Sequence, residues 1–465
     1  MANSGIITPK GLNLAQNPLA LQPGEMIRCV NVTSDQFGAK KKRPGYTTYL
    51  GTADNAVVDS LFNFTKDNGT QFWNYRASGG TVYYSQQGTG DWTNAGNGTM
   101  TAGTYMGNVV MENTMMIGDG VSASRHTTNG TSFTNTSSAP IAGGFVDYQG
   151  RIWARGTSSD MFYSQVGTPT GWTGDSSSIH IPGPGKLNGI EKVADRIVTT
   201  KNSGVMHRYD GYNLYDLSTR LGFTSPAAVV NVEDYRFGLN RLGVYGFGGE
   251  RPEIVSNPIE KQIYNDAATG IVGTVFDNAP AGVYRYEMMW SVGNITDDLT
   301  NETLTNALLV HDYQTSEWGN FTFANRPTSF LTYKDATGND QFVFGDATGQ
   351  CYTYGGTATS DNGATIPVVM EGIVHGDTLL DKKWEWIRLM FNPGCEAMVQ
   401  VAISNTFTKG RKNWINVGQA IDGVVEFRFP EGTRGKFLYW KINESSRTAR
   451  LNFYGLEFSA EAIAK

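Results

Sequence analysis

The sequence predicts an all-β protein built around a β-propeller of six or seven blades. Residues 83–86 (Tyr-Tyr-Ser-Gln) lead past a glycine to Trp92, and residues 162–165 (Phe-Tyr-Ser-Gln) lead past a glycine to Trp172. Midway between these two phrases, Phe133 takes the place of the tryptophan. The resulting period of about 40 residues is that of a four-stranded propeller blade. Because each blade leaves one face for the next blade to cover, we expect the recurrent aromatic side chain to fill the seam between blades.

The composition agrees with a large all-β chain. Glycine accounts for 56 of the 465 residues, well above its average share of about 7%, and aromatic residues make up 12%. Charged residues make up only 17%, against an average of about 25%. The net charge of −6 argues against a protein that binds nucleic acid by neutralising phosphates. It is compatible with a surface past which a polyanion slides without sticking.

Residues 1–50 are expected to form an extended N-terminal arm, because asparagine, proline and glycine separate its leucines. The arm ends in four consecutive basic residues, 40–43, followed by Pro44-Gly45-Tyr46. One short basic run does not define a binding surface, so we expect these side chains to be solvated or paired with acidic neighbours. Phosphate binding by this run is the alternative.

The propeller is expected to span residues 51–355. Short strand-like runs separated by Asn-Gly, Asp-Gly and Gly-Gly turns group into blade-sized units. These units cover residues 58–84, 109–133, 145–172, 190–215, 229–247, 284–318 and 330–352. The later units drift from the period, which leaves the count at six or seven. Tyr212 and Tyr215 hold the aromatic place in the fourth unit.

The pattern changes after a turn-rich linker at residues 355–363. Apolar and polar residues then alternate with a period of two, which is the pattern of half-buried strands. The alternating runs are residues 384–389, 398–403, 425–429, 436–442 and 451–456. We expect residues 366–465 to form a C-terminal β-sandwich.

No catalytic, cofactor-binding or metal-binding residues are expected, and the chain is predicted not to be an enzyme. The histidines are scattered, without the spacing of a metal site: His126, His180, His207, His311 and His375. His207 lies three residues before Asp210, and we expect a strand-end histidine paired with a nearby aspartate rather than a proton-transfer group.

Three further motifs resemble functional loops but lack essential residues. Asp119-Gly120 and residues 361–363 (Asp-Asn-Gly) are not followed by calcium ligands, and residues 246–249 (Gly-Phe-Gly-Gly) lack the lysine of a phosphate loop. The Ser-to-Trp phrase has roughly the spacing of the Asp-box turn of sialidases. Glutamine replaces the aspartate in the first copy of the phrase and valine replaces it in the second, and that turn is structural even in sialidases.

The cysteines and the apolar segments exclude other classes. Cys29, Cys351 and Cys395 are odd in number and far apart, so no disulfide framework is expected. No apolar stretch approaches the length of a membrane span, and the N-terminal residues lack the apolar segment of a secretion signal.

Several short motifs occur in a characteristic order. They are Gly11-Leu12-Asn13, Asn17-Pro18-Leu19, Asn31-Val32, Arg43-Pro44-Gly45, residues 309–313 (Leu-Val-His-Asp-Tyr) with Trp318, residues 344–352, and Lys383-Trp384. This succession resembles the β-propeller virion proteins of bacteriophage tails, of the tail hub, tail nozzle and packaged-DNA stabilisation type. The resemblance covers nearly the whole chain in order and length, and the order carries more weight than any single motif.

The resemblance implies a structural virion protein of the tail, assembled in the host cytoplasm and needing no cofactor. It would form a ring, a homohexamer, that continues the DNA exit channel, retains packaged DNA and supports distal tail proteins. Its expected partners are further copies of itself, a portal or head-completion protein, and a tail fibre, spike or needle protein. Contact with the genomic DNA that passes the channel would be non-specific, and no membrane span is expected.

Two alternatives belong to other classes of protein. The first is a tail-tip propeller that binds a receptor or glycan, with Trp92 and Trp172 stacking on sugar rings. The second is a glycan hydrolase propeller. The regular spacing of the tryptophans favours a place in the blade core over a binding surface.

Overall fold

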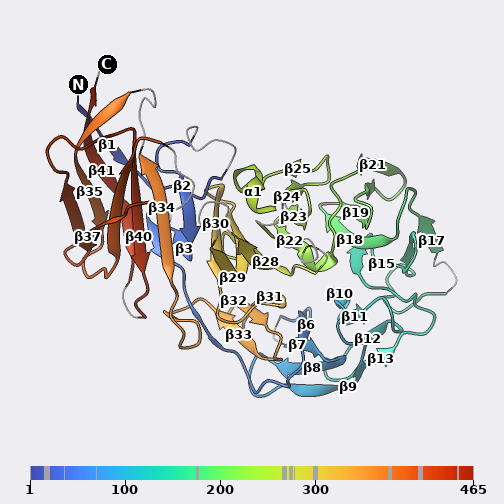
Figure 1. Ribbon diagram of the computed structural model, residues 1–465. Helices are drawn as coiled ribbons and strands as arrows, with labels where there is room; N and C mark the ends of the chain where they lie inside the picture. Colours follow the sequence, from blue (N-terminus) through green and yellow to red (C-terminus); the bar gives the residue numbers. More distant parts are fainter. Residues whose placement is uncertain are drawn as a thin grey trace.

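The computed structural model describes residues 2–14, 21–35, 37–69, 71–173, 177–263, 270–271, 276, 278–296, 302–374, 380–406, 412–447 and 450–463. Figure 1 shows a ring of small sheets beside a layered β-domain, with both termini at the outer end of that domain. Asn17-Pro18-Leu19 and His375 lie outside the described residues. No helix in the described ranges is long and apolar enough to cross a membrane.

Six four-stranded antiparallel sheets form separate blades of a β-propeller. The first three are β6 (Val58–Thr65), β7 (Phe72–Ser78), β8 (Thr81–Gln86) and β9 (Thr93–Thr99); β10 (Gly107–Met111), β11 (Thr114–Gly118), β12 (Arg125–Thr127) and β13 (Thr134–Asn135); and β14 (Phe145–Tyr148), β15 (Arg151–Arg155), β16 (Asp160–Tyr163) and β17 (Ser177–His180). The next two are β18 (Leu187–Val193), β19 (Arg196–Lys201), β20 (Met206–Tyr209) and β21 (Leu214–Ser218); and β22 (Val229–Val232), β23 (Tyr235–Asn240), β24 (Gly243–Phe247) and β25 (Glu253–Ile254). The last consists of β31 (Ser329–Lys334), β32 (Asp340–Gly345), β33 (Cys351–Tyr354) and β5 (Tyr46–Thr48).

The remaining sector of the ring is filled by part of a larger sheet. Strands β27 (Ala281–Tyr284), β28 (Glu287–Thr296), β29 (Thr303–Asp312) and β30 (Glu317–Thr322) pair in the order of a blade, and β26 (Gly270–Ile271) joins β28. Strand β27 lies between β22 and β31, and β31 lies against β6, so the ring closes. This seventh sector continues into a ten-stranded sheet. The ring therefore consists of six separate blades and a seventh sector that belongs to the larger sheet. The prediction of an all-β propeller is confirmed.

Aromatic side chains fill three of the seams as expected. Phe133 is fully buried and Trp172 nearly so, and Trp92 is half-buried against a core cluster of the neighbouring blade. The expectation for the fourth unit is wrong, because Tyr212 is 89% exposed and Tyr215 is 41% exposed. The physical reason is that Tyr212 sits in a tight turn, where Asp210 accepts the backbone N–H groups of residues 212 and 213.

Phe223 fills the seam at that point instead. It is fully buried in a cluster shared by the fourth and fifth blades. A side chain at Gly189 would place its Cβ only 1.8 Å from the ring of Phe223. The phenylalanine therefore fits only because the facing residue is a glycine.

The β-domain consists of two sheets that share one core. The first sheet contains β1 (Ala2–Ile7), β3 (Val32–Ser34), β4 (Lys40–Lys42), β35 (Asp381–Phe391), β38 (Val424–Arg428), β39 (Arg434–Gly435) and β41 (Asn452–Ile463). The second sheet extends the seventh sector through β2 (Met26–Val30), β34 (Val368–Val374), β40 (Phe437–Glu444), β36 (Met398–Ser404) and β37 (Ile415–Gln419). Buried residues of both sheets, such as Trp384 and Trp440, belong to one apolar cluster. This sandwich-like arrangement contains every strand expected after residue 380.

The apolar cluster of the β-domain also reaches the propeller. It includes Leu239 and Val244 of the fifth blade and Ile263 of the short helix α1 (Glu260–Ile263). Single 3₁₀ turns lie at Pro226–Ala228 and Asn257–Ile259. Propeller and β-domain are therefore packed on a continuous core.

The N-terminal arm is interwoven with both parts. Strand β1 pairs with β41, β2 pairs with β30 and β34, and β4 pairs with β41. Strand β5 is the outer strand of the last blade, where it pairs with β33. The beginning of the chain thus completes the final blade and supplies strands to both sheets of the β-domain.

Candidate functional site: a cleft between the arm, the propeller and the β-domain

The basic run at the end of the arm is neutralised inside the molecule. The ion pairs are Lys40–Glu317, Lys41–Asp35 at 3.2 Å, Lys42–Glu444 at 3.0 Å and Arg43–Asp361 at 2.6 Å. The side chains of Lys40, Lys42 and Arg43 are almost fully buried. The expectation that the run pairs with acidic neighbours is confirmed for all four residues.

Arg43 connects three segments of the chain. Its guanidinium donates two hydrogen bonds to Asp361 of the linker, at 2.8 and 2.6 Å, and lies 4.5 Å from the centre of the Phe323 ring. Its Nε donates to Oδ1 of Asn31 at 2.8 Å. A planar group with several donors in fixed directions suits such a junction, which a lysine would satisfy only in part.

Asn31 completes the junction. It is fully buried and adopts φ = 58°, a conformation that asparagine tolerates better than most residues. Its side-chain amide donates to Thr322 Oγ1 and to the carbonyl of Pro367, and its Oδ1 also accepts the N–H of Thr322. Three of its side-chain hydrogen bonds therefore connect the arm with β30 and with the segment before β34, and the fourth holds Arg43.

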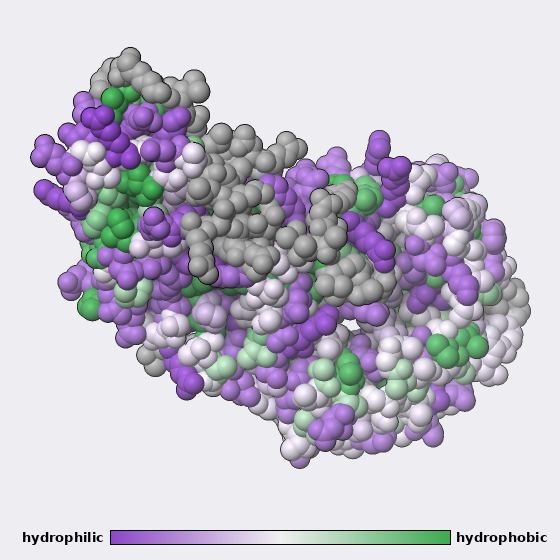
Figure 2. Space-filling model, in the orientation of Figure 1, coloured by the Kyte–Doolittle hydropathy of each residue, from purple (hydrophilic) through white to green (hydrophobic). Residues whose placement is uncertain are grey.

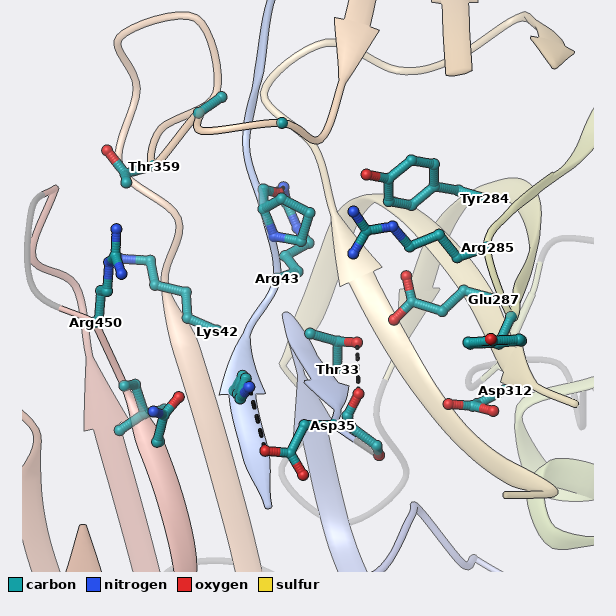
Figure 3. Close-up of a pocket in the computed structure, with 18 of the residues that line it drawn as sticks. Thr33, Asp35, Lys42, Arg43, Tyr284, Arg285, Glu287, Asp312, Thr359 and Arg450 are labelled. Atoms are coloured by element: carbon teal, nitrogen blue, oxygen red, sulfur yellow. Dashed lines mark hydrogen bonds and ion pairs between the residues drawn. The ribbon is translucent and has the colours of Figure 1, made fainter. Parts of the chain in front are cut away.

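A cleft of about 730 Å³ lies beside this junction (Figure 3). One wall is the arm, from Thr33 to Pro44. The propeller supplies the tight turn between β27 and β28 and the turn after β29, while the linker supplies residues 356–359 and the β-domain residues 450–452. A volume of this size is in the range of small-molecule binding sites.

Two guanidinium groups line the cleft without a carboxylate partner among the described residues. Arg285, at the tip of the β27–β28 turn, lies 5.2 Å from the ring centre of Tyr284, which holds it by a cation–π contact. Arg450 reaches the cleft from the β-domain. In Figure 3, Arg285 projects from the propeller side and Arg450 lies near Lys42 on the opposite side.

Glu287 is a buried carboxyl group at the same cleft. It is 7% exposed and stands directly opposite Asp312 in the antiparallel pair β28–β29. Burial raises the pKa of Glu287 to about 7, and the negative charge of Asp312 adds to this shift. Near neutral pH this group is therefore present both as a hydrogen-bond acceptor and as a protonated donor.

Aromatic rings stand at the rim of the cleft. Tyr286 is 50% exposed, and its ring packs edge-on against Tyr313 at 5.7 Å. Phe37, on the arm, is 84% exposed. The cleft thus combines exposed rings with charged and hydroxyl-bearing side chains.

A smaller cavity of about 300 Å³ lies among the inner strands of the propeller. Glu191 and Arg236 face each other there at 3.8 Å, and burial raises the pKa of Glu191 to about 7.

The residues considered for chemistry are placed in structural roles. His207 is buried and its Nε2 lies 3.2 Å from Asp216, so the expected histidine–aspartate pair forms with a different aspartate from Asp210. Burial lowers the pKa of His207, and lowers that of His311 to about 4. Asp119 accepts backbone N–H groups of residues 101, 121 and 122. The described residues contain no cluster of three or more metal-ligating side chains.

The sequence analysis singled out the basic run and the linker that line the cleft, but not its propeller residues. Residues 284–286 (Tyr-Arg-Tyr) read as part of a strand, and Glu287 carried no motif. The only local sign of a turn there is that two residues, 285 and 286, separate β27 from β28. The partners of that turn come from the arm and from residues 450–452, which no local pattern connects.

Comparisons with known proteins found no sequence relative and only remote structural neighbours. No protein-family model matches the chain, and no curated protein matches its sequence. BamB from Moraxella catarrhalis shares 10% identity over 76% of this chain and 97% of its own length, with a TM-score of 0.41. YCF48 bound to D1 peptide shares 9% identity over 67% of this chain and 99% of its own, with a TM-score of 0.42. The extracellular domain of the putative one component system BT4673 from B. thetaiotaomicron shares 10% identity over 88% of this chain and 58% of its own, with a TM-score of 0.44. The chain is thus a β-propeller protein by its own sheet order.

Proposed function

We propose that this chain is a structural virion protein of a phage tail, a hub, nozzle or head-closure ring that continues the DNA exit channel and supports distal tail proteins. The observation that carries the proposal is the interweaving of the arm with the propeller and the β-domain. Because strands from the start of the chain pair in both parts, neither part can move away without breaking sheet hydrogen bonds. A rigid body of this kind suits a ring that holds packaged DNA under pressure.

The arm motifs that carry the resemblance make contacts of this kind. Gly11 leaves no room for a side chain, because its Cβ would lie 2.8 Å from the backbone of Trp318. Asn31 and Arg43 form the junction with Thr322 and Asp361. Gly11, Asn31 and Arg43 therefore fasten the arm to the propeller sector or to the linker, which is compatible with the rigid body that we propose.

The charge of the chain bears on the position of DNA in the proposed assembly. Because the basic run is neutralised internally, it is not available to hold phosphate, and the proposed path of DNA is the axis of a ring of copies. A ring of six copies, each with a net charge of −6, would present a surface that repels phosphate over a Debye length of about 8–10 Å.

The glycan-binding alternative based on the periodic tryptophans is weakened by their burial. Trp172 is 6% exposed in a core cluster, and Trp92 packs edge-on against Tyr49 at 6.1 Å and faces the guanidinium of Arg76 at 5.2 Å. Neither ring offers a free face of the size that sugar stacking requires.

The test is electron microscopy of phage particles that lack this chain, combined with native mass spectrometry of the purified protein. Empty or leaking heads without tails would support a head-closure ring, and filled heads with shortened tails would support a nozzle. Complete particles that fail only to adsorb would overturn the structural role. Rings of purified protein would support self-assembly around a channel. A protein that stays monomeric even when the other tail proteins are added would contradict it.

A further inference from the structure

We propose that the cleft between the arm and the β27–β28 turn binds a neutral saccharide. This binding activity goes beyond the structural function and does not depend on it. The argument rests on the balance of charge in the cleft, on the exposed rings at its rim, and on the mixture of hydrogen-bond donors and acceptors inside.

The mixture of charges in the cleft favours a neutral ligand over a strongly charged one. Lys41, Lys42 and Arg43 are already paired with carboxylates. The remaining cations, Arg285 and Arg450, share the cleft with the carboxyl groups of Asp312 and of Glu287, the second of which is ionised only in part near neutral pH. A polyanion would meet these carboxyl groups and a polycation would meet the guanidinium groups, whereas a neutral ligand meets both without penalty.

The rings at the rim suit the apolar faces of sugar rings. Tyr286 is half exposed but is held in place by Tyr313 at 5.7 Å, so little side-chain entropy is lost when a ligand packs on it. Phe37 offers a second exposed ring from the arm. Two rings contributed by different walls of one cleft match a ligand of more than one sugar unit.

The polar groups inside suit hydroxyl groups, which donate and accept at once. Arg285 donates only, and its orientation is fixed by Tyr284. Glu287, with a buried carboxyl group aimed into the cleft in Figure 3, accepts when ionised and also donates when protonated. Threonine hydroxyls of the linker, at residues 357 and 359, add groups that do both.

The test uses saturation-transfer difference NMR with the full-length chain and defined probes. The neutral probes are maltotriose, cellotriose and tri-N-acetylchitotriose, and trigalacturonate is the acidic probe. We expect transfer to the ring protons of at least one neutral probe, and no stronger binding of the acidic one. Tyr286→Ala should weaken that binding about tenfold, and Phe37→Ala should weaken it as well.

Tyr235→Ala is the matched control. Tyr235 is 56% exposed next to the corresponding turn of the adjacent blade, where it does not line the cleft. The control should bind the probe like the unaltered chain. Melting curves of all variants verify folding, which exposed tyrosines should hardly affect.

Two outcomes would overturn the inference. One is the absence of transfer to any neutral probe; if Tyr286→Ala then also abolishes ring assembly, the cleft belongs to a protein partner. The other is binding that Tyr286→Ala and Phe37→Ala leave unchanged. Failure of the structural role in phage particles would leave the saccharide result standing, so the two proposals are separable.

Discussion

Replacing Arg43 with methionine tests whether the arm is fastened to the molecule by one buried ion pair. Arg43 is 1% exposed and Asp361 is 3% exposed. Methionine keeps the apolar part of the side chain but is shorter and removes the donors to Asp361 and Asn31. The carboxylate would remain buried, with the N–H of Ala324 at 3.3 Å as its remaining donor among the described residues.

The expected loss of stability is about 3–5 kcal/mol, because removal of one partner leaves an uncompensated buried charge. The unfolding entropy of about 2.1 cal/mol/K per residue gives about 1 kcal/mol/K for 465 residues that unfold together. The melting temperature should therefore fall by about 3–5 °C. The double variant Arg43→Met/Asp361→Leu should recover most of this loss, since both partners of the pair are then apolar.

The assay is differential scanning calorimetry, with Lys334→Met as the control. The pair Lys334–Asp340 has a similar distance of 2.9 Å, but its side chains are 70% and 68% exposed. Exposed pairs contribute little, so the control should melt close to the unaltered chain. The reasoning is refuted if Arg43→Met melts like the control, or if the double variant is no more stable than the single one.

Two further predictions concern the cleft and the linker. Because the pKa of Glu287 is raised from its ordinary value of 4.5 to about 7, the folded state binds more protons than the unfolded state between these values. Stability should therefore fall by up to about 3 kcal/mol as pH rises from 4.5 through 7, and Glu287→Gln should flatten this part of the pH profile in urea titrations; an unchanged profile would contradict the assignment. Gly45→Ala should destabilise the chain strongly, because the new Cβ would lie 2.0 Å from the carbonyl oxygen of Ser360. Gly96→Ala, whose nearest neighbour would be at 3.6 Å, should be tolerated in the same melting experiment, and equal melting temperatures for the two variants would refute the argument.

The ring could be predicted because its determinants are local. A blade is a run of antiparallel strands joined by short turns, so its hydrophobic alternation and its turn residues appear within about 40 residues of sequence. Phe133 and Trp172 then repeat at the place where one blade meets the next. Tyr212 failed this prediction because an aromatic residue at the right interval says nothing about whether the local turn directs it inward.

The cleft could not be predicted, because its walls come from segments that are far apart in the chain. Glu287 is an ordinary strand residue until pairing places it opposite Asp312 and burial raises its pKa. The basic run illustrates the same point. Its sequence shows four positive charges, but only the folded chain supplies Glu317, Asp35, Glu444 and Asp361 as their partners.

Local pattern in the chain therefore determined the strands and the blades. The tertiary structure alone decided how the arm closes the last blade, which charges are neutralised and where the cleft opens. The physical reason is that strand formation depends on neighbours in sequence, whereas the environment of a charge depends on groups brought near it by long-range packing.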